Sequence, residues 1–224
     1  LGHGKSPLSS MDPFCFTLSI TDNKMSPLNP HFSPKKALKF DFLRFREVPA
    51  EGAESLLILV HGRTGNLRVL EFFTKRPALH GMSKLLIEAP FEDERESESL
   101  GLKTKTQEAY SWYLRETQSS GGSLSPIVPG QLEDSRQRLS AFVDALLEAG
   151  WASSQIFWLG FSQGSAMILD LALREPRVFG GFVCVSGFCL MVSRHTPAPM
   201  AWDQKILITH GSRDEIVTLE SADR

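Results

Sequence analysis

The sequence lacks a strong net charge and any long hydrophobic run. Its 224 residues carry 24 Lys and Arg against 26 Asp and Glu, a formal net charge of −2. Proteins that bind nucleic acids or membrane surfaces electrostatically usually carry a basic excess, so this balance argues against both functions. The longest nearly uncharged apolar stretch, residues 180–192, is too short to span a bilayer. We therefore expect neither a nucleic-acid partner nor a membrane span.

Cysteine is also scarce. Cys15, Cys184 and Cys189 are too few and too scattered for a disulfide framework. The spacing between Cys184 and Cys189 is not that of zinc ligands. We interpret all three as thiols in a reducing compartment, which predicts a cytoplasmic protein.

The first 36 residues differ in composition from the rest. They are rich in Pro and Ser and show no hydrophobic periodicity. Such a composition is typical of a flexible leader rather than a packed domain. We therefore predict a leader over residues 1–36 and a single domain over residues 37–224.

Within this domain, short buried strands alternate with helices. Five runs contain only apolar residues: 56–60, 85–87, 156–159, 182–185 and 206–208. Such runs are typical of strands covered on both faces of a parallel sheet. Helical spacing of apolar residues over 139–147 and over 165–174 indicates amphipathic helices. The alternation predicts an α/β fold, a mostly parallel sheet with helices on both faces, whose ligands bind beyond the carboxyl ends of the strands.

A Gly-Phe-Ser-Gln-Gly pentapeptide, residues 160–164, follows one predicted strand and opens the next helix. This is the context of a nucleophile elbow, in which a Ser hydroxyl stands on a sharp turn above the sheet. Gly160 and Gly164 remove side chains that would collide with the neighbouring strand and helix. The motif predicts Ser162 as a nucleophile and the backbone N–H of Gln163 as a donor to an oxyanion.

A serine nucleophile needs a general base and an acid that orients the base. Asp214 follows the strand predicted at 206–208, which places it at the same edge of the sheet as Ser162. The order Ser then acid is that of the Ser, Asp/Glu, His series expected for this fold. We predict Asp214 as the acid, with Glu215 as the competing residue.

The second oxyanion donor is expected from the loop after an early strand. Residues 61–65, His-Gly-Arg-Thr-Gly, occupy that place. Gly62 and Gly65 let the backbone approach a substrate, so we predict the N–H of Arg63 as this donor. We interpret His61 as a hydrogen-bonded residue that holds the loop rather than as the catalytic base.

A long polar excursion lies between Pro90 and Gln131. Its charged residues are typical of a solvated surface loop. Trp112 and Tyr113 inside it have two possible roles, either packing or the wall of an apolar substrate pocket.

Together these motifs resemble the phospholipase/carboxylesterase family of α/β-hydrolases, which includes acyl-protein thioesterases and small bacterial carboxylesterases. The resemblance covers about residues 38–224 and is carried by four segments: 61–63, 160–167, 186–187 and 210–217. It implies hydrolysis of small to medium carboxylic esters or thioesters through an acyl-enzyme, without a metal or organic cofactor.

The resemblance implies that Ser162 is the nucleophile, that Asp214 is the acid and that the N–H groups of Arg63 and Gln163 are the oxyanion donors. In the family the catalytic His lies beyond the acid, after one more strand, but no His follows Asp214 in this sequence. The domain's four histidines lie elsewhere in the pattern: His61, His80, His195 and His210. We therefore expect a carboxyl-terminally truncated hydrolase, with the fold's last strand and helix missing and the catalytic His beyond Arg224.

Two other functions stay open. A protein that retains the pocket but lacks the base would bind its ligand without turning it over. A related serine peptidase or acyltransferase is the second alternative, because the elbow does not name its substrate. The sequence does not indicate an oligomeric state.

Overall fold

A computed structural model describes six segments of the chain: residues 35–38, 40–93, 108–116, 126–190, 202–214 and 216–217. All of them belong to one unit of contacts that spans residues 34–224. The predicted leader, residues 1–36, lies outside the described residues except for Lys35 and Lys36.

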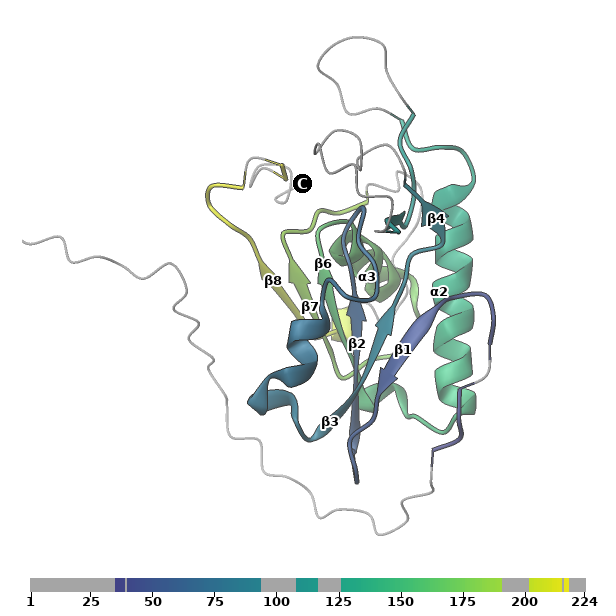
Figure 1. The fold of residues 1–224 in the computed structure, drawn as a ribbon, viewed down its shortest axis with the longest axis vertical. Coiled ribbons are helices and arrows are strands. Elements are labelled where there is room, and N and C mark those ends of the chain that lie inside the picture. The colour runs from purple at the N-terminus through teal and green to yellow at the C-terminus, as the bar shows by residue number, and fades with distance from the viewer. Residues whose placement is uncertain are drawn as a thin grey trace, which may run out of the picture. The chain divides into compact units, whose positions relative to one another are not determined.

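The central sheet has six strands in the order β1-β3-β2-β6-β7-β8 (Figure 1). The strands are β1 (Phe45–Val48), β2 (Ser55–Val60), β3 (Met82–Ile87), β6 (Ile156–Phe161), β7 (Gly181–Val185) and β8 (Ile206–Thr209). Strand β1 pairs antiparallel with β3, whereas every other neighbouring pair is parallel. The mostly parallel sheet predicted from the sequence is confirmed.

Strand β2 shows why the apolar runs are continuous. Leu56, Ile58 and Val60 join the hydrophobic cluster on one face of the sheet, and Leu57 and Leu59 join the cluster on the other. Successive side chains of a strand point to opposite faces. A strand covered on both faces therefore needs apolar residues at every position.

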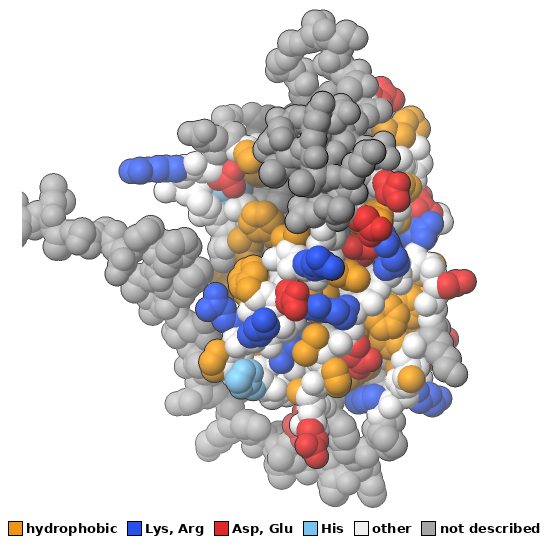
Figure 2. Space-filling model, in the orientation of Figure 1, with side chains coloured by type: hydrophobic (Ala, Val, Ile, Leu, Met, Phe, Trp, Pro, Cys, Tyr) orange, Lys and Arg blue, Asp and Glu red, His pale blue; other side chains and the backbone are white. Residues whose placement is uncertain are grey.

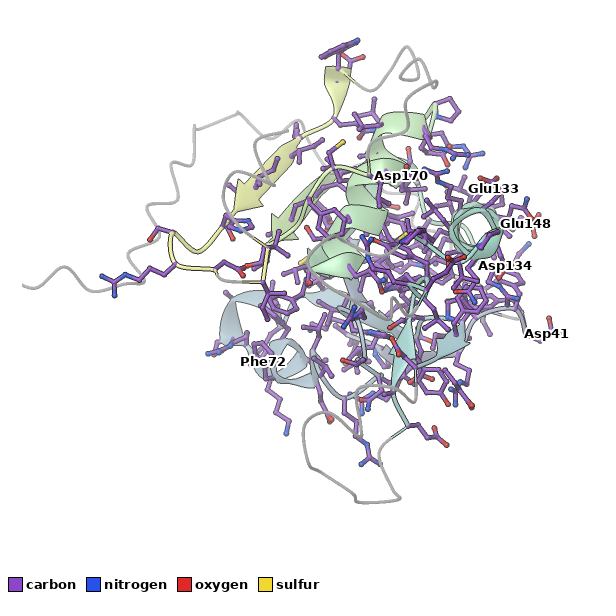
Figure 3. All side chains as sticks on the ribbon, turned by 90° about the horizontal axis from the view of Figure 1, so that it is seen from above. Asp41, Phe72, Glu133, Asp134, Glu148 and Asp170 are labelled. Carbon is purple, nitrogen blue, oxygen red and sulfur yellow. The ribbon has the colours of Figure 1, made fainter. Side chains whose placement is uncertain are left out.

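The two faces carry different kinds of helix. Helices α2 (Gln131–Glu148) and α3 (Gln163–Arg174) pack on one face, where Phe142 and Ile168 join the larger cluster. The short 3-10 helices η1 (Glu71–Lys75) and η2 (Pro77–Leu79) contribute to the cluster on the other face. A further 3-10 turn, η3 (Ser153–Gln155), leads into β6. Figure 3 shows α2 and α3 on the opposite side of the sheet from Phe72 of η1, and Figure 2 shows the η1 side, where Lys and Arg lie among hydrophobic side chains.

The polar excursion contains a second, small sheet. Strand β4 (Phe91–Glu92) pairs antiparallel with β5 (Tyr110–Ser111). Residues 110–113 of the excursion are buried, whereas the prediction of a solvated loop concerned its charged residues. Most of its charged first part and its Ser- and Gly-rich stretch fall in residues 94–107 and 117–125, outside the described residues.

None of the helices in the described segments combines the length and the apolar composition needed to cross a bilayer.

Candidate active site

Ser162 sits on a sharp turn between β6 and α3. Its backbone angles, a φ of 51° and a ψ of −117°, lie in a region that residues other than Gly rarely adopt. Two hydrogen bonds hold the turn: the Ser162 N–H donates to Val185 O at 2.9 Å, and the Ala166 N–H donates to Ser162 O at 3.0 Å. A strained residue fixed by its neighbours in this way is typical of a functional position. The strand, turn and helix that the pentapeptide predicts are all present.

The two glycines of the pentapeptide make room for this turn. A Cβ at Gly160 would lie 2.7 Å from the backbone N and Cα of Ser165. A Cβ at Gly164 would collide with the carbonyl oxygens of Val60 and His61. In both cases the obstacle is backbone, which cannot swing away as a side chain can. The close packing of β2, β6 and α3 therefore requires glycine on either side of Ser162.

The loop after β2 lies against the elbow. A Cβ at Gly62 would lie 3.3 Å from the Cβ of Ser162, so these two backbones are close neighbours. Arg63 follows directly and is exposed, whereas the side chain of Gln163 is buried. The structure thus brings together the two segments that were predicted to supply oxyanion donors.

His61 holds this loop through both ring nitrogens. Its Nε2 accepts a hydrogen bond from the Ala89 N–H at 3.0 Å, and its Nδ1 lies 2.6 Å from Gly62 O. This pattern assigns the hydrogen to Nδ1 and leaves the ring neutral. Burial of the ring lowers the pKa of His61 to about 4. A neutral imidazole with both nitrogens engaged is not available as a base for Ser162.

Asp214 lies in the turn after β8, at the same edge of the sheet as Ser162. Its Oδ1 accepts hydrogen bonds from the N–H groups of Val217 and Ile216, both at 3.0 Å. The bond from Val217 contributes most to lowering the pKa of Asp214, helped by the bond from Ile216 and by the side chain of Ser186. These donors favour the charged form, so the group is a carboxylate at neutral pH. Its competitor, Glu215, lies outside the described residues.

Ser186 is a site residue whose role was not recognised from the sequence. It follows β7 and has a φ of 48°, and its N–H donates to Thr209 O at 2.8 Å. Its side chain helps to lower the pKa of the Asp214 carboxyl group. The signal that could have found it is its place directly after a buried strand, between the strands that carry Ser162 and Asp214.

Trp112 and Tyr113 lie in the hydrophobic core. Their exposed fractions are 0% and 1%, and both belong to the larger cluster. Of the two roles left open, burial supports packing. A contact with substrate remains a prediction.

None of the three described histidines supplies an evident base. His61 is engaged as above, and Nε2 of His210 lies 2.5 Å from Val217 O and 3.6 Å from Asp214 Oδ2. His80 precedes β3 and therefore lies at the opposite edge of the sheet from Ser162. His195 lies outside the described residues. Within the described segments, no group of three or more His, Cys, Asp or Glu is placed to hold a metal ion.

Solved structures identify the class of fold. Esterase PE8 superposes with a TM-score of 0.62 at 20% identity, covering 81% of this chain and 80% of that one. A carboxylesterase from Mesorhizobium loti gives a TM-score of 0.61 at 17% identity, covering 83% and 79%. Likeness at such low identity speaks for architecture alone. The predicted α/β-hydrolase fold is confirmed.

Sequence comparison finds similarity to one family over part of the chain. The model of the Phospholipase/Carboxylesterase family matches residues 128–224. Acyl-protein thioesterase 1 of Kluyveromyces lactis is 26% identical over 92 residues, which cover 40% of this chain and 40% of the relative. A probable carboxylesterase of Oryza sativa subsp. japonica is 32% identical over 114 residues, covering 50% and 42%. The matched regions thus span less than half the length of these relatives. The resemblance predicted from the sequence is confirmed, and residues 128–224 carry the pattern of the phospholipase/carboxylesterase family.

Proposed function

We propose that the protein is a serine hydrolase that cleaves small to medium carboxylic esters or thioesters through an acyl-enzyme. The observation that carries the proposal is the strained turn at Ser162, with Gly62 packed against it. The similarity to carboxylesterases and acyl-protein thioesterases supports esters or thioesters as the substrate class. The chemistry uses no metal or organic cofactor, the expected partner is the small-molecule substrate, and the free thiols favour a cytoplasmic location.

In this mechanism the Oγ of Ser162 attacks the carbonyl carbon of the substrate while a base takes the hydroxyl proton. The carbonyl oxygen becomes an oxyanion, which the N–H groups of Arg63 and Gln163 stabilise. The alcohol or thiol leaves with a proton returned by the base, and water then hydrolyses the acyl-enzyme in the same way.

The general base in this proposal is an imidazole from outside the described residues, expected beyond Asp214 in the chain order of this fold. The Asp214 carboxylate orients that imidazole and stabilises its charged form. The hydrogen bonds to Asp214 lower its pKa and so keep it ionised at neutral pH.

The experiment measures hydrolysis of p-nitrophenyl butyrate, and labelling by a fluorophosphonate, in the protein translated from its complete natural reading frame. We expect Ser162→Ala to abolish labelling and to lower kcat/KM by roughly 10⁴-fold or more. Ser140→Ala, at an exposed position on α2, is the matched control and should change neither. Hydrolysis that persists in Ser162→Ala would refute the proposal.

A panel of ester, thioester and amide substrates separates the remaining classes. Turnover of esters and thioesters without amides supports the hydrolase, whereas preferred turnover of amides favours a peptidase. Binding of esters without labelling or turnover would favour the protein that lacks a base.

A further inference from the structure

Residues 110–113, here called the brace, donate hydrogen bonds to two carbonyl oxygens of the loop after β2, residues 61–65. The Tyr110 N–H donates to Gly65 O at 2.9 Å. The indole Nε1–H of Trp112 donates to His61 O, also at 2.9 Å. These bonds fall at the two ends of the five-residue loop, so the brace fixes both ends of the segment that contains Arg63.

A third contact reaches the middle of the same loop. The N–H of Thr64, a residue with a φ of 55°, donates to the Oγ of Ser111 at 3.1 Å. The Ser111 hydroxyl is fully buried and donates to Oδ2 of Asp93 at 2.7 Å. Because its hydrogen is committed to a carboxylate, the hydroxyl turns a lone pair toward Thr64. The Thr64 N–H belongs to the peptide unit directly after Arg63, so this contact holds the neighbour of the expected donor.

The brace also holds the other donor segment. The buried side chain of Gln163 accepts the Trp112 N–H through Oε1 at 2.9 Å and donates to Tyr113 O through Nε2 at 2.8 Å. Gln163 directly follows Ser162 and is the residue whose backbone N–H is the second expected donor. Its side chain is thus paired twice with the main chain of the brace.

We propose that the brace sets the separation of the two oxyanion donors, with Ser111 and Asp93 as its positioning residues. This inference rests on the proposed function. Each donor loop belongs to a different strand connection, and the brace bonds to both of them. Oxyanion donors act only when held at hydrogen-bond distance from the developing charge. A shift of one loop therefore weakens the stabilisation of the transition state more than it weakens the binding of substrate.

The test is Ser111→Ala in the protein translated from its complete reading frame. It removes the hydroxyl that accepts the Thr64 N–H and so loosens the middle of the loop. We expect kcat for p-nitrophenyl butyrate to fall roughly 10- to 100-fold, less than the 10²–10³-fold cost of deleting a donor outright, with KM changed less than about twofold. Affinity for a trifluoromethyl ketone, whose tetrahedral adduct places an oxygen in the same hole, should fall by the same factor as kcat/KM.

Ser83→Ala is the matched control. Ser83 is also buried and accepts a backbone N–H, that of Ala50, at 3.1 Å, but at the opposite edge of the sheet. Its loss should lower the melting temperature about as much as Ser111→Ala while leaving kcat within about twofold. Ser111→Ala with kcat/KM unchanged, while hydrolysis still depends on Ser162, would overturn the brace alone. Hydrolysis that persists in Ser162→Ala would overturn the proposed function as well.

A pair of variants at Asp93 decides the question if Ser111→Ala does not fold. Asp93→Asn keeps an amide oxygen that can accept the Ser111 hydroxyl, so kcat should stay within about threefold. Asp93→Ala removes the acceptor, and kcat should fall by about tenfold. Equal kcat values in the two variants would contradict the proposal.

Discussion

The imidazole of His61 accepts a hydrogen bond from the backbone N–H of Ala89, 3.0 Å from its Nε2. The two residues follow the neighbouring parallel strands β2 and β3, so the bond ties together the ends of these strands. It exists only while Nε2 carries no hydrogen. Burial lowers the pKa of His61 to about 4, so Nε2 carries no added proton at neutral pH. The hydrogen bond that holds the loop containing Arg63 is therefore kept.

The first prediction concerns the pH dependence of stability. Between about pH 4 and pH 6.5 the unfolded chain binds a proton at His61 and the folded chain does not, so the free energy of unfolding rises with pH. This contribution is complete above about pH 6.5 and is lost as the pH falls toward 4, with a maximum of about 3 kcal/mol. Urea unfolding at a series of pH values measures it.

A test variant and a control variant distinguish the contribution of His61 to this pH dependence from that of other groups. His61→Gln should flatten the slope of unfolding free energy against pH in this window. His80→Gln changes an exposed imidazole and should leave the slope as it is in the wild type. Equal slopes in the two variants would contradict the assignment to His61.

The central strands were predictable because they are buried on both faces, which requires an apolar residue at every position. The runs at 56–60 and 156–159 are apolar throughout because each faces two clusters, and both are strands at the predicted places. The elbow was predictable because its five residues form one short motif, although the backbone that requires glycine at position 164 is that of Val60 and His61, far away in the sequence. A motif carried by adjacent residues is visible without any structure.

The brace was not predictable in this way. Its partners lie far away along the chain, and each contact uses a main-chain group or a single polar atom. Hydrogen bonds of this kind impose no periodicity on the sequence, so Ser111 and Asp93 look like ordinary loop residues. For the same reason the burial of Trp112 could not be distinguished from a place on a pocket wall.

The second prediction tests the packing around the elbow through Gly164→Ala. The added Cβ would collide with the carbonyl oxygens of Val60 and His61, and strand β2 would have to move away from α3. We expect a loss of roughly 2–4 kcal/mol in unfolding free energy and loss of fluorophosphonate labelling at Ser162. Gly81→Ala is the matched control, since no atom lies within 4 Å of its added Cβ. Equal melting temperatures of the two variants in thermal unfolding would contradict the prediction.

The third prediction concerns Asp214, which the proposed function makes the orienting acid. Asp214→Asn keeps the shape and one acceptor oxygen but removes the charge that stabilises an imidazolium. We expect kcat for p-nitrophenyl butyrate to fall by about 10⁴-fold with little change in melting temperature. Asp203→Asn, at an exposed position just before β8, should leave kcat unchanged. A fall of less than tenfold in Asp214→Asn would favour Glu215 as the acid.

The fourth prediction concerns the ion pair that joins α2 to α3, the helix that begins at the elbow. The guanidinium of Arg136 binds Asp170 at two points, 2.9 and 2.6 Å, and the side chains are 10% and 5% exposed. Figure 3 shows Asp170 on α3 and Asp134 on α2. The pair between Arg138 and Asp134 lies within α2, makes one contact at 2.7 Å and is 34% and 40% exposed, so it is both weaker in geometry and more open to water.

Burial decides the expected cost of breaking each pair. Asp170→Ala leaves the Arg136 charge in a nearly dry site, with Glu133 as its remaining partner at 3.5 Å. We expect a loss of roughly 3–5 kcal/mol in unfolding free energy, measured by urea denaturation at pH 7. Asp134→Ala breaks an ion pair that water can replace, and should cost less than about 1 kcal/mol. If both variants lost the same amount, water would have to reach Arg136 as freely as it reaches Arg138, and α2 and α3 could not be packed as closely as the structure shows.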